Sequence, residues 1–242
     1  MLMGPQNLPE QVRIVRNRIS SAAAAALRNV DSVTLLAVSK AQPANKVRAV
    51  AQEGVRDFGE SYVQEALDKI EALRDLSLTW HFIGRLQANK TRPVAASFDW
   101  VHAVDRLKIA ERLSEQRPFH APPLNVCLQV NIGGEGSKGG VTTAELPALA
   151  AAVAALPGLK LRGLMCIPPD EDDPSRQRAW FASLRRELEA LNAAGAQLDT
   201  LSMGMSGDFE SAILEGATLV RIGTALFGPR DAPENPRIAL HD

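Results

Sequence analysis

The sequence repeats one pattern along most of its length: a short apolar run of strand length, followed by a stretch with helical periodicity. Eight such runs can be counted in the 242 residues, with no linker and no change of composition between them. Runs without polar alternation are typical of parallel strands buried on both faces. Eight strand and helix units in a chain of this length predict a single α/β domain over residues 1–242, a closed (β/α)8 TIM barrel. One miscounted strand would leave an open parallel sheet as the alternative.

The predicted strands cover residues 33–40, 55–60, 79–84, 98–104, 124–132, 161–166, 198–203 and 219–222. Helices are predicted between them, at residues 45–52, 62–73, from about 89, 106–115, 146–156, 177–191 and 209–215. A further amphipathic helix at about 8–28 carries Val12, Val15 and Ile19 on one side, and we expect it to cover one end of the domain.

Composition and charge exclude several classes of function. The formal net charge is -1, so we expect no general attraction to nucleic acid or to an anionic membrane. No apolar run is long enough to cross a bilayer, and the first residues lack the features of a secretory signal. The two cysteines, Cys127 and Cys166, lie in apolar runs and are predicted to be buried, reduced thiols. These features predict a cytoplasmic protein, which we expect to be a monomer.

The first apolar run ends on Lys40. In a parallel barrel the carboxyl ends of all strands meet at one mouth, where ligands bind. A lysine at this place either marks the solvent end of the strand or contacts a ligand. The predicted rim also contains residues 60–61, 84–85, 104–105, 131, 166–167, 202–206 and 221–224.

Two glycine-containing turns on this rim are typical of an anion site. Residues 202–208 and 221–228 follow the seventh and eighth strands, and each leads into a helical stretch. Backbone N–H groups at such turns bind phosphate, and these two loops are the usual phosphate site of the barrel. The alternative is that the glycines only permit tight turns. A phosphate site facing a strand-end lysine indicates either pyridoxal phosphate held as a Schiff base or a sugar-phosphate aldolase.

Five segments closely resemble the pyridoxal phosphate homeostasis protein family, and the resemblance extends from about residue 8 to residue 228. The segments are VSK at 38–40, FGESYVQE at 58–65, HFIGRLQANK at 81–90, LSMGMS at 201–206 and VRIGT at 220–224. That family is similar in fold to the barrel of bacterial alanine racemase, a pyridoxal phosphate barrel of fold type III. Because the chain ends at Asp242, we expect the β domain that follows the barrel in racemases to be absent.

The resemblance also implies roles for single residues toward pyridoxal 5'-phosphate. It implies that Lys40 is the Schiff-base lysine, that Arg221 faces the pyridine nitrogen, and that the phosphate is held by Ser206, Gly223 and Thr224. The family usually has asparagine where this chain has Ser61, so a hydrogen bond to the ring there is expected to be altered or absent. A guanidinium only donates hydrogen bonds, so Arg221 disfavours a protonated pyridine ring and the electron sink that it provides.

Other polar segments receive simpler interpretations. The glycine-rich residues 133–140 are predicted to form a mobile lid, in which Lys138 could act as a second amine. Asn89 and Lys90 belong either to a ligand site or to a solvated turn, and residues 170–173 are predicted to be a solvated acidic loop. No metal site is predicted, since the histidines lack ligand spacing and are expected to be structural or exposed; they are His81, His102, His120 and His241.

The resemblance implies a non-catalytic protein of vitamin B6 homeostasis, which holds pyridoxal phosphate reversibly and without substrate turnover. The partners that could receive the cofactor would then be apo forms of enzymes that use pyridoxal phosphate. An amino-acid racemase or a Schiff-base lyase is the alternative from the enzyme class. A third alternative is an interaction protein with a vestigial site.

Overall fold

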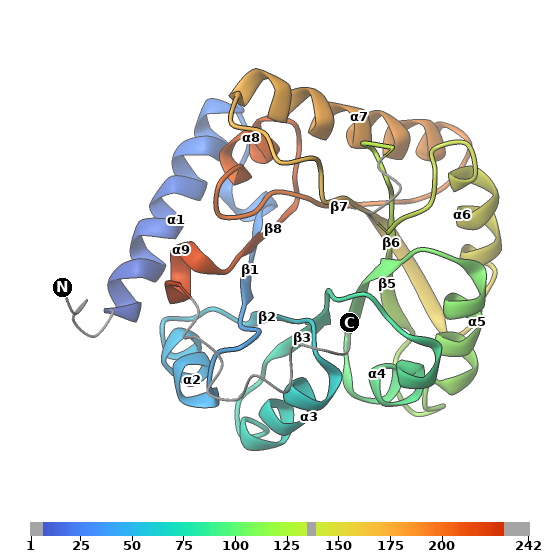
Figure 1. Ribbon diagram of the computed structural model, residues 1–242, viewed down its shortest axis with the longest axis horizontal. Helices are drawn as coiled ribbons and strands as arrows, with labels where there is room; N and C mark the ends of the chain where they lie inside the picture. Colours follow the sequence, from blue (N-terminus) through green and yellow to red (C-terminus); the bar gives the residue numbers. More distant parts are fainter. Residues whose placement is uncertain (1–6, 135–138, 230–242) are drawn as a thin grey trace.

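The computed structural model describes residues 7–134 and 139–229, and within them eight parallel strands close into a barrel in chain order (Figure 1). The last strand pairs with the first, which confirms the predicted (β/α)8 TIM barrel. The strands are β1 (Thr34–Val38), β2 (Asp57–Glu60), β3 (Thr79–Phe82), β4 (Trp100–Val104), β5 (Leu124–Gln129), β6 (Leu159–Met165), β7 (Thr200–Ser202) and β8 (Leu219–Ile222).

Helices surround the barrel as an outer layer. They are α1 (Leu8–Ala25), α2 (Ala44–Gln52), α3 (Val63–Ala72), α4 (Thr91–Ser97), α5 (Leu107–Gln116), α6 (Leu146–Ala154), α7 (Pro174–Ala193), α8 (Phe209–Leu214) and α9 (Thr224–Phe227), with 3-10 turns at η1 (Val30–Ser32) and η2 (Ala88–Lys90). The helix after β8 has only four residues, too few to cover β8 and β1. The N-terminal helix, which is expected above to cover one end of the domain, instead fills this place on the flank of the barrel, where α1 packs against α2, α8 and α9.

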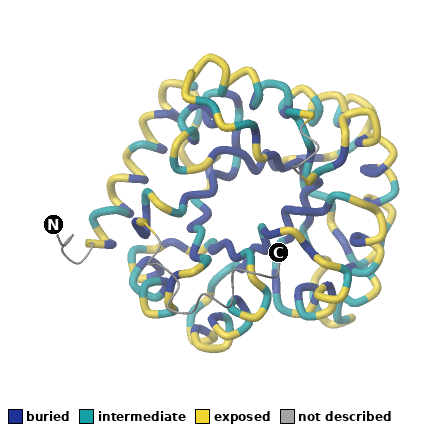
Figure 2. Tube along the Cα trace, in the orientation of Figure 1, coloured by how far each residue is buried: buried dark blue, intermediate teal, exposed yellow. Residues whose placement is uncertain are grey.

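The strand register decides which side chains face the barrel interior. Leu36 is paired with Arg221, and Gly59 is paired with both Val38 and His81. Paired residues of parallel strands point to the same face, so the interior of this barrel contains charged and polar groups as well as apolar ones. The strands form the buried inner ring in Figure 2, and exposed residues gather on the outer helices.

Several element boundaries differ from the predicted ones, and three of these differences have a visible local cause or consequence. Strand β1 ends at Val38, so Lys40 lies in the turn beyond the strand. Strand β5 ends at Gln129, because the chain then forms a single bridge between Val130 and Val141. Helix α7 begins at Pro174, and the side chain of Asp173 accepts a hydrogen bond from the N–H of Ser175 at 2.8 Å. The last residue of the predicted acidic loop is therefore a helix cap.

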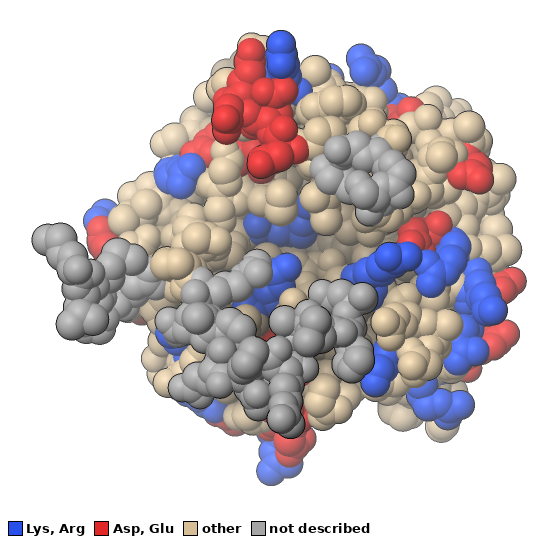
Figure 3. All heavy atoms as spheres, viewed as in Figure 1, with Lys and Arg blue, Asp and Glu red and all other residues tan. Residues whose placement is uncertain are grey.

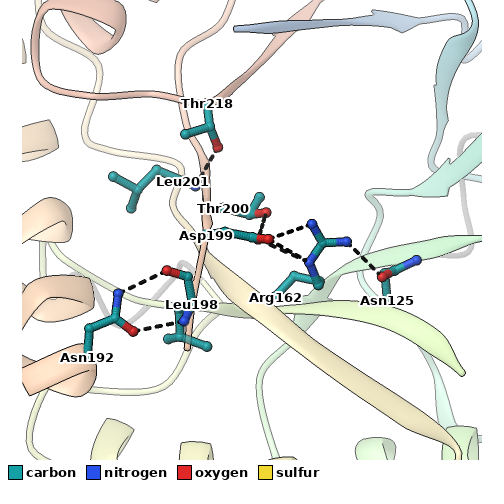
Figure 4. Close-up of polar contacts among 8 residues, drawn as sticks. All are labelled: Asn125, Arg162, Asn192, Leu198, Asp199, Thr200, Leu201 and Thr218. Carbon is teal, nitrogen blue, oxygen red and sulfur yellow. Dashed lines mark hydrogen bonds and ion pairs between the residues drawn. The ribbon is translucent and has the colours of Figure 1, made fainter. Parts of the chain in front are cut away.

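Polar contacts close the amino-terminal end of the barrel, which we call the base (Figure 4). Arg162 on β6 forms an ion pair with Asp199 at 2.7 Å and donates to the amide oxygen of Asn125 at 3.0 Å. Its guanidinium also lies 4.9 Å from the ring centroid of Trp100. These contacts satisfy the arginine at the base, and the opposite end, which we call the mouth, carries the segments discussed below.

Both cysteines are free and buried, as predicted. Burial raises the pKa of each thiol to about 12. Within residues 7–134 and 139–229, no helix combines the length and the apolar character needed to span a membrane.

Candidate functional site

Lys40 occupies a turn whose backbone is held on both sides. The hydroxyl of Ser39 donates to Glu60 Oε1 at 2.6 Å, and the N–H of Ala41 donates to Glu65 Oε1 at 2.7 Å. Ala41 has a φ of 58°, in the left-handed region that costs a residue with a Cβ about 1–2 kcal/mol. Side-chain hydrogen bonds therefore hold the Lys40 turn in a conformation that its sequence would otherwise disfavour.

Lys69 of α3 joins these two anchors into one buried cluster. Its Nζ donates to the carbonyl of Ser39 at 2.6 Å, to Glu60 Oε1 at 2.7 Å and to Glu65 Oε1. Glu60 is fully buried, and this burial raises the pKa of its carboxyl against the opposing effect of Lys69. An ammonium has three N–H donors, so Lys69 is fully used in holding the turn of Lys40.

A small hollow at the mouth brings Lys40 together with two of the predicted phosphate residues. It is lined by Val38, Lys40, Gln42, Gly223, Thr224, Phe227 and Gly228. A hollow of about 560 Å³ lies at the base, where Arg16, Arg56 and Asp57 are among its lining residues. We regard the smaller hollow as the candidate site, because the larger one contains none of the predicted cofactor residues.

The turn after β7 reaches the same place. The hydroxyl of Ser206 accepts a hydrogen bond from the N–H of Ala225 at 3.2 Å, which joins this turn to the one after β8. Gly204 has a φ of 92°, and a Cβ there would lie 2.6 Å from the Cβ of Ala212. Glycine is therefore required for the turn that carries Ser206.

Arg221 lies at the end of β8 and is 5% exposed. Its Nη1 donates to the carbonyl and to the hydroxyl of Ser202, at 2.6 and 2.9 Å, and its Nη2 donates to the carbonyl of Cys166 at 2.8 Å. Burial lowers the pKa of this guanidinium, which nevertheless stays a cation in proteins. Within the described residues, the Nε–H and the second Nη2–H have no hydrogen-bond acceptor, so they are available to a ligand.

The remaining predicted residues are placed as follows. Ser61 lies in the turn after β2, where its backbone packs against Gly84, and no hydrogen bond within the described residues links its side chain to the Lys40 turn. Lys138 lies outside the described residues, as does the centre of the predicted lid. Lys90 is exposed in η2. The structure therefore brings Lys40 together with Ser206, Gly223 and Thr224. Arg221 lies two residues before Gly223, near the end of β8.

Glu60 and Ser202 were placed on the predicted rim, but the buried polar contacts around this site were not predicted from the sequence. His81 and His102 are expected above to be structural or exposed, and both are buried inside the barrel, with His81 Nδ1 2.9 Å from His102 Nε2. Lys69 lies in a predicted helix and carries no sequence signal of its own. A histidine in the middle of an otherwise apolar strand is the one signal that could have indicated such a contact.

The comparisons with known proteins agree with this geometry. A family model described as the N-terminal domain of alanine racemase matches residues 14–231. Fold and mouth therefore define a barrel of the class that alanine racemase uses as its N-terminal domain.

Within that class, the chain belongs to the pyridoxal phosphate homeostasis protein family, as its five motifs predict. The protein of that name from Pseudomonas aeruginosa is 60% identical over 224 residues, which cover 93% of this chain and 96% of the relative. The one from Escherichia coli K12 is 52% identical over 220 residues, covering 90% and 94% of the two chains. A solved structure of PipY from Synechococcus elongatus, described with pyridoxal phosphate bound, is 38% identical with a TM-score of 0.77 and covers 88% of this chain and all 100% of PipY.

Proposed function

We propose that this protein binds pyridoxal 5'-phosphate at the mouth of its barrel and serves the homeostasis of that cofactor. The observation that carries the proposal is the meeting of Lys40 with Gly223 and Thr224 around one hollow. The family membership reported above supports it. Pyridoxal phosphate supplies an aldehyde that condenses reversibly with a lysine amine, and Lys40 is the proposed amine.

The residues present fit each part of the cofactor. The proposed phosphate site combines the hydroxyl of Ser206 with the backbone of Gly223 and Thr224, because hydroxyl and N–H donors bind phosphate. The ring nitrogen is an acceptor, and Arg221 has N–H donors without an acceptor in the described part of the chain. A contact of Ser61 with the ring stays a prediction from the sequence.

We further propose that the protein holds the cofactor without substrate turnover. Arg221 can donate to an unprotonated ring nitrogen but cannot accept a proton from a protonated one, so the ring would be a weak electron sink. Racemisation also needs acid and base groups on both faces of the substrate. The one tyrosine of the sequence that could serve as the second group is Tyr62, and it is 47% exposed beside α3.

Reduction of the loaded protein with borohydride tests the proposed site. We expect visible absorbance on addition of pyridoxal phosphate, and one modified peptide, containing Lys40, after reduction and proteolysis. Lys40→Arg keeps the charge and should remove the label, whereas Lys108→Arg, at an exposed lysine, should leave it unchanged. A label on Lys90 or Lys138 in the wild-type protein would reassign the site.

The alternative enzyme function can be separated by a second measurement. Incubation with L-alanine in D₂O should give no multiple turnovers to the D-enantiomer and only slow incorporation of α-deuterium. Chiral chromatography with mass spectrometry measures both quantities. Multiple turnovers that disappear in Lys40→Ala would establish a racemase and overturn the carrier proposal.

A further inference from the structure

A line of hydrogen-bonded side chains crosses the interior of the barrel from mouth to base. It contains one residue from each of five strands: Arg221 on β8, Ser202 on β7, His102 on β4, His81 on β3 and Asp57 on β2. The joining distances in that order are 2.9, 2.8, 2.9 and 3.0 Å. Asp57 is the only member with substantial exposure, and it lies where β2 begins, at the base.

The chemistry of Arg221 sets the direction of the first links. A guanidinium has no acceptor, so Arg221 must donate to the hydroxyl of Ser202. The hydroxyl hydrogen of Ser202 then has one acceptor within the described residues, Nδ1 of His102. His102 therefore accepts at Nδ1, and as a neutral ring it carries its hydrogen on Nε2.

The same reasoning extends the direction to the base. Nε2–H of His102 donates to Nδ1 of His81, which places the hydrogen of His81 on its own Nε2. That Nε2–H donates to the carboxylate of Asp57, which can only accept when it is ionised. Every link then has one donor and one acceptor.

The reverse direction would leave groups unsatisfied. Ser202 would have to accept twice, and its buried hydroxyl hydrogen would have no acceptor in the described part of the chain. The neutral ring of His81 would also turn a lone pair toward the carboxylate oxygen of Asp57. Ser202 and His102 are 0% exposed and His81 is 1% exposed, so one unsatisfied group here costs about 1–3 kcal/mol. Burial, together with the nearby His81 and Arg221, lowers the pKa of His102 well below its ordinary value, which agrees with a neutral ring.

We propose that Ser202, His102 and His81 are positioning residues for Arg221, forming a one-way hydrogen-bond chain that is anchored on Asp57. The chain holds the guanidinium so that its remaining N–H donors meet the ring nitrogen of pyridoxal phosphate, and to this extent it rests on the proposed function. Its two neutral rings also keep the anchoring carboxylate away from Arg221. A carboxylate in direct contact would compete with the ring nitrogen for the same donors.

The direction of the chain can be measured without cofactor. Long-range ¹H–¹⁵N correlation spectra of the apo protein, assigned with single histidine variants, report which ring nitrogen of each histidine carries hydrogen. We expect His81 and His102 both to be neutral with hydrogen on Nε2. Hydrogen on Nδ1 of His102, or a positively charged His102, would overturn the proposed direction.

The effect on the cofactor is tested from the far end of the chain. Asp57→Asn changes only the anchor, because an amide can donate to His81 as well as accept from it. We expect a shifted absorption maximum of bound pyridoxal phosphate and a weaker Kd, both measured by titration. Asp199→Asn alters another carboxylate at the base, paired with Arg162 and outside the chain, and should leave the absorption maximum unchanged. Equal spectra for Asp57→Asn and wild type would show that the charge of Asp57 does not reach the ring nitrogen, and would refute Asp57 as the anchor of the chain.

A second pair of variants covers the case in which Asp57→Asn does not fold. Ser202→Ala removes the link that Arg221 contacts, and we expect affinity for pyridoxal phosphate to fall about tenfold. Ser202→Thr keeps the hydroxyl and should restore most of that affinity. If the alanine and threonine variants bind alike, Ser202 does not position Arg221. A wild-type protein with the predicted ring hydrogens that fails to bind the cofactor would refute the proposed function instead.

Discussion

His102 and Arg221 are two potentially cationic side chains that are buried and contact the same Ser202 hydroxyl, and only one of them is charged. Arg221 retains its proton under ordinary conditions. His102 is fully buried between Ser202 and His81, and burial is the largest cause that lowers its pKa. A buried histidine with a lowered pKa reduces the stability of the folded protein at any pH where the unfolded chain binds a proton that the folded protein does not.

The resulting prediction concerns the pH dependence of stability. The unfolded His102 has an ordinary pKa of 6.5 and the folded one a much lower pKa, so below about pH 6.5 the unfolded state binds more protons. The free energy of unfolding should therefore fall as pH falls, by up to about 1.4 kcal/mol per pH unit from this group. Urea denaturation at a series of pH values measures this dependence. The free energy of unfolding should change less steeply with pH in His102→Gln than in wild type.

A matched variant isolates the cause. His120→Gln removes an exposed histidine, and its free energy of unfolding should depend on pH as that of the wild type does. The raised pKa of Glu60 acts with the opposite sign at acid pH, and it is common to all three proteins. Parallel curves for wild type and His102→Gln would show that His102 takes up protons equally in both states.

At the scale of elements, α3 fastens the turn between β1 and α2. Lys69 and Glu65 of α3, together with Glu60 at the end of β2, make every contact described above for the backbone around Lys40. The ion pair of Lys69 with Glu60 has side-chain exposures of 6% and 0%, so little water screens it. Removing one partner of such a pair leaves a buried charge without compensation.

Lys69→Met is therefore expected to lower the free energy of unfolding by about 3 kcal/mol. It should also weaken the binding of pyridoxal phosphate, because Lys40 would lose its fixed backbone. Denaturation and an absorbance titration measure the two effects. Arg74→Met removes an exposed ion pair with Glu71 just beyond the same helix, and it should change neither quantity measurably.

The double variant Lys69→Met with Glu60→Leu separates charge from packing. Replacing both partners of a buried ion pair by apolar residues is often nearly neutral. We therefore expect the double variant to recover most of the lost stability. If it is less stable than Lys69→Met alone, the cluster acts through its shape and not through its charge.

At the scale of the whole molecule, the small net charge conceals an uneven distribution. In Figure 3, lysine and arginine side chains gather over α4 and α5. Arg85 and Lys90 follow β3 and Arg106 follows β4, so these three exposed cations lie on the side of the mouth. The phosphate of pyridoxal phosphate is anionic, and fixed charges near a site raise the rate at which an opposite charge arrives.

Association of pyridoxal phosphate should therefore slow as ionic strength rises. Arg85→Gln should lower the association rate at low salt by about twofold to threefold and leave the rate at high salt nearly unchanged. Lys160→Gln makes the same change of charge at an exposed position where β6 begins, near the base. Stopped-flow absorbance measures the rates. Equal losses in the two variants would show that net charge matters and the position of the charge does not.

The architecture and much of the mouth could be predicted from the amino-acid sequence. Eight apolar runs alternating with amphipathic stretches predict the barrel, because each unit buries its strand locally. Lys40 and the glycine turns around Ser206 and Gly223 were also predictable, since each directly follows a strand. Strand and helix ends were less accurate, because capping by Asp173 and the bridge at Val130 depend on contacts that apolar periodicity does not record.

The side chains that surround the site could not be predicted, because they meet only in the folded barrel. His102 and Ser202 are 100 residues apart in sequence, and Lys69 lies 30 residues from the carbonyl that it holds. A barrel interior collects alternate residues from strands that are distant in the chain, and no local pattern records which of them will touch. The tautomers of His81 and His102 follow from that convergence alone, because each ring's hydrogen is placed by the partner that the fold brings to it.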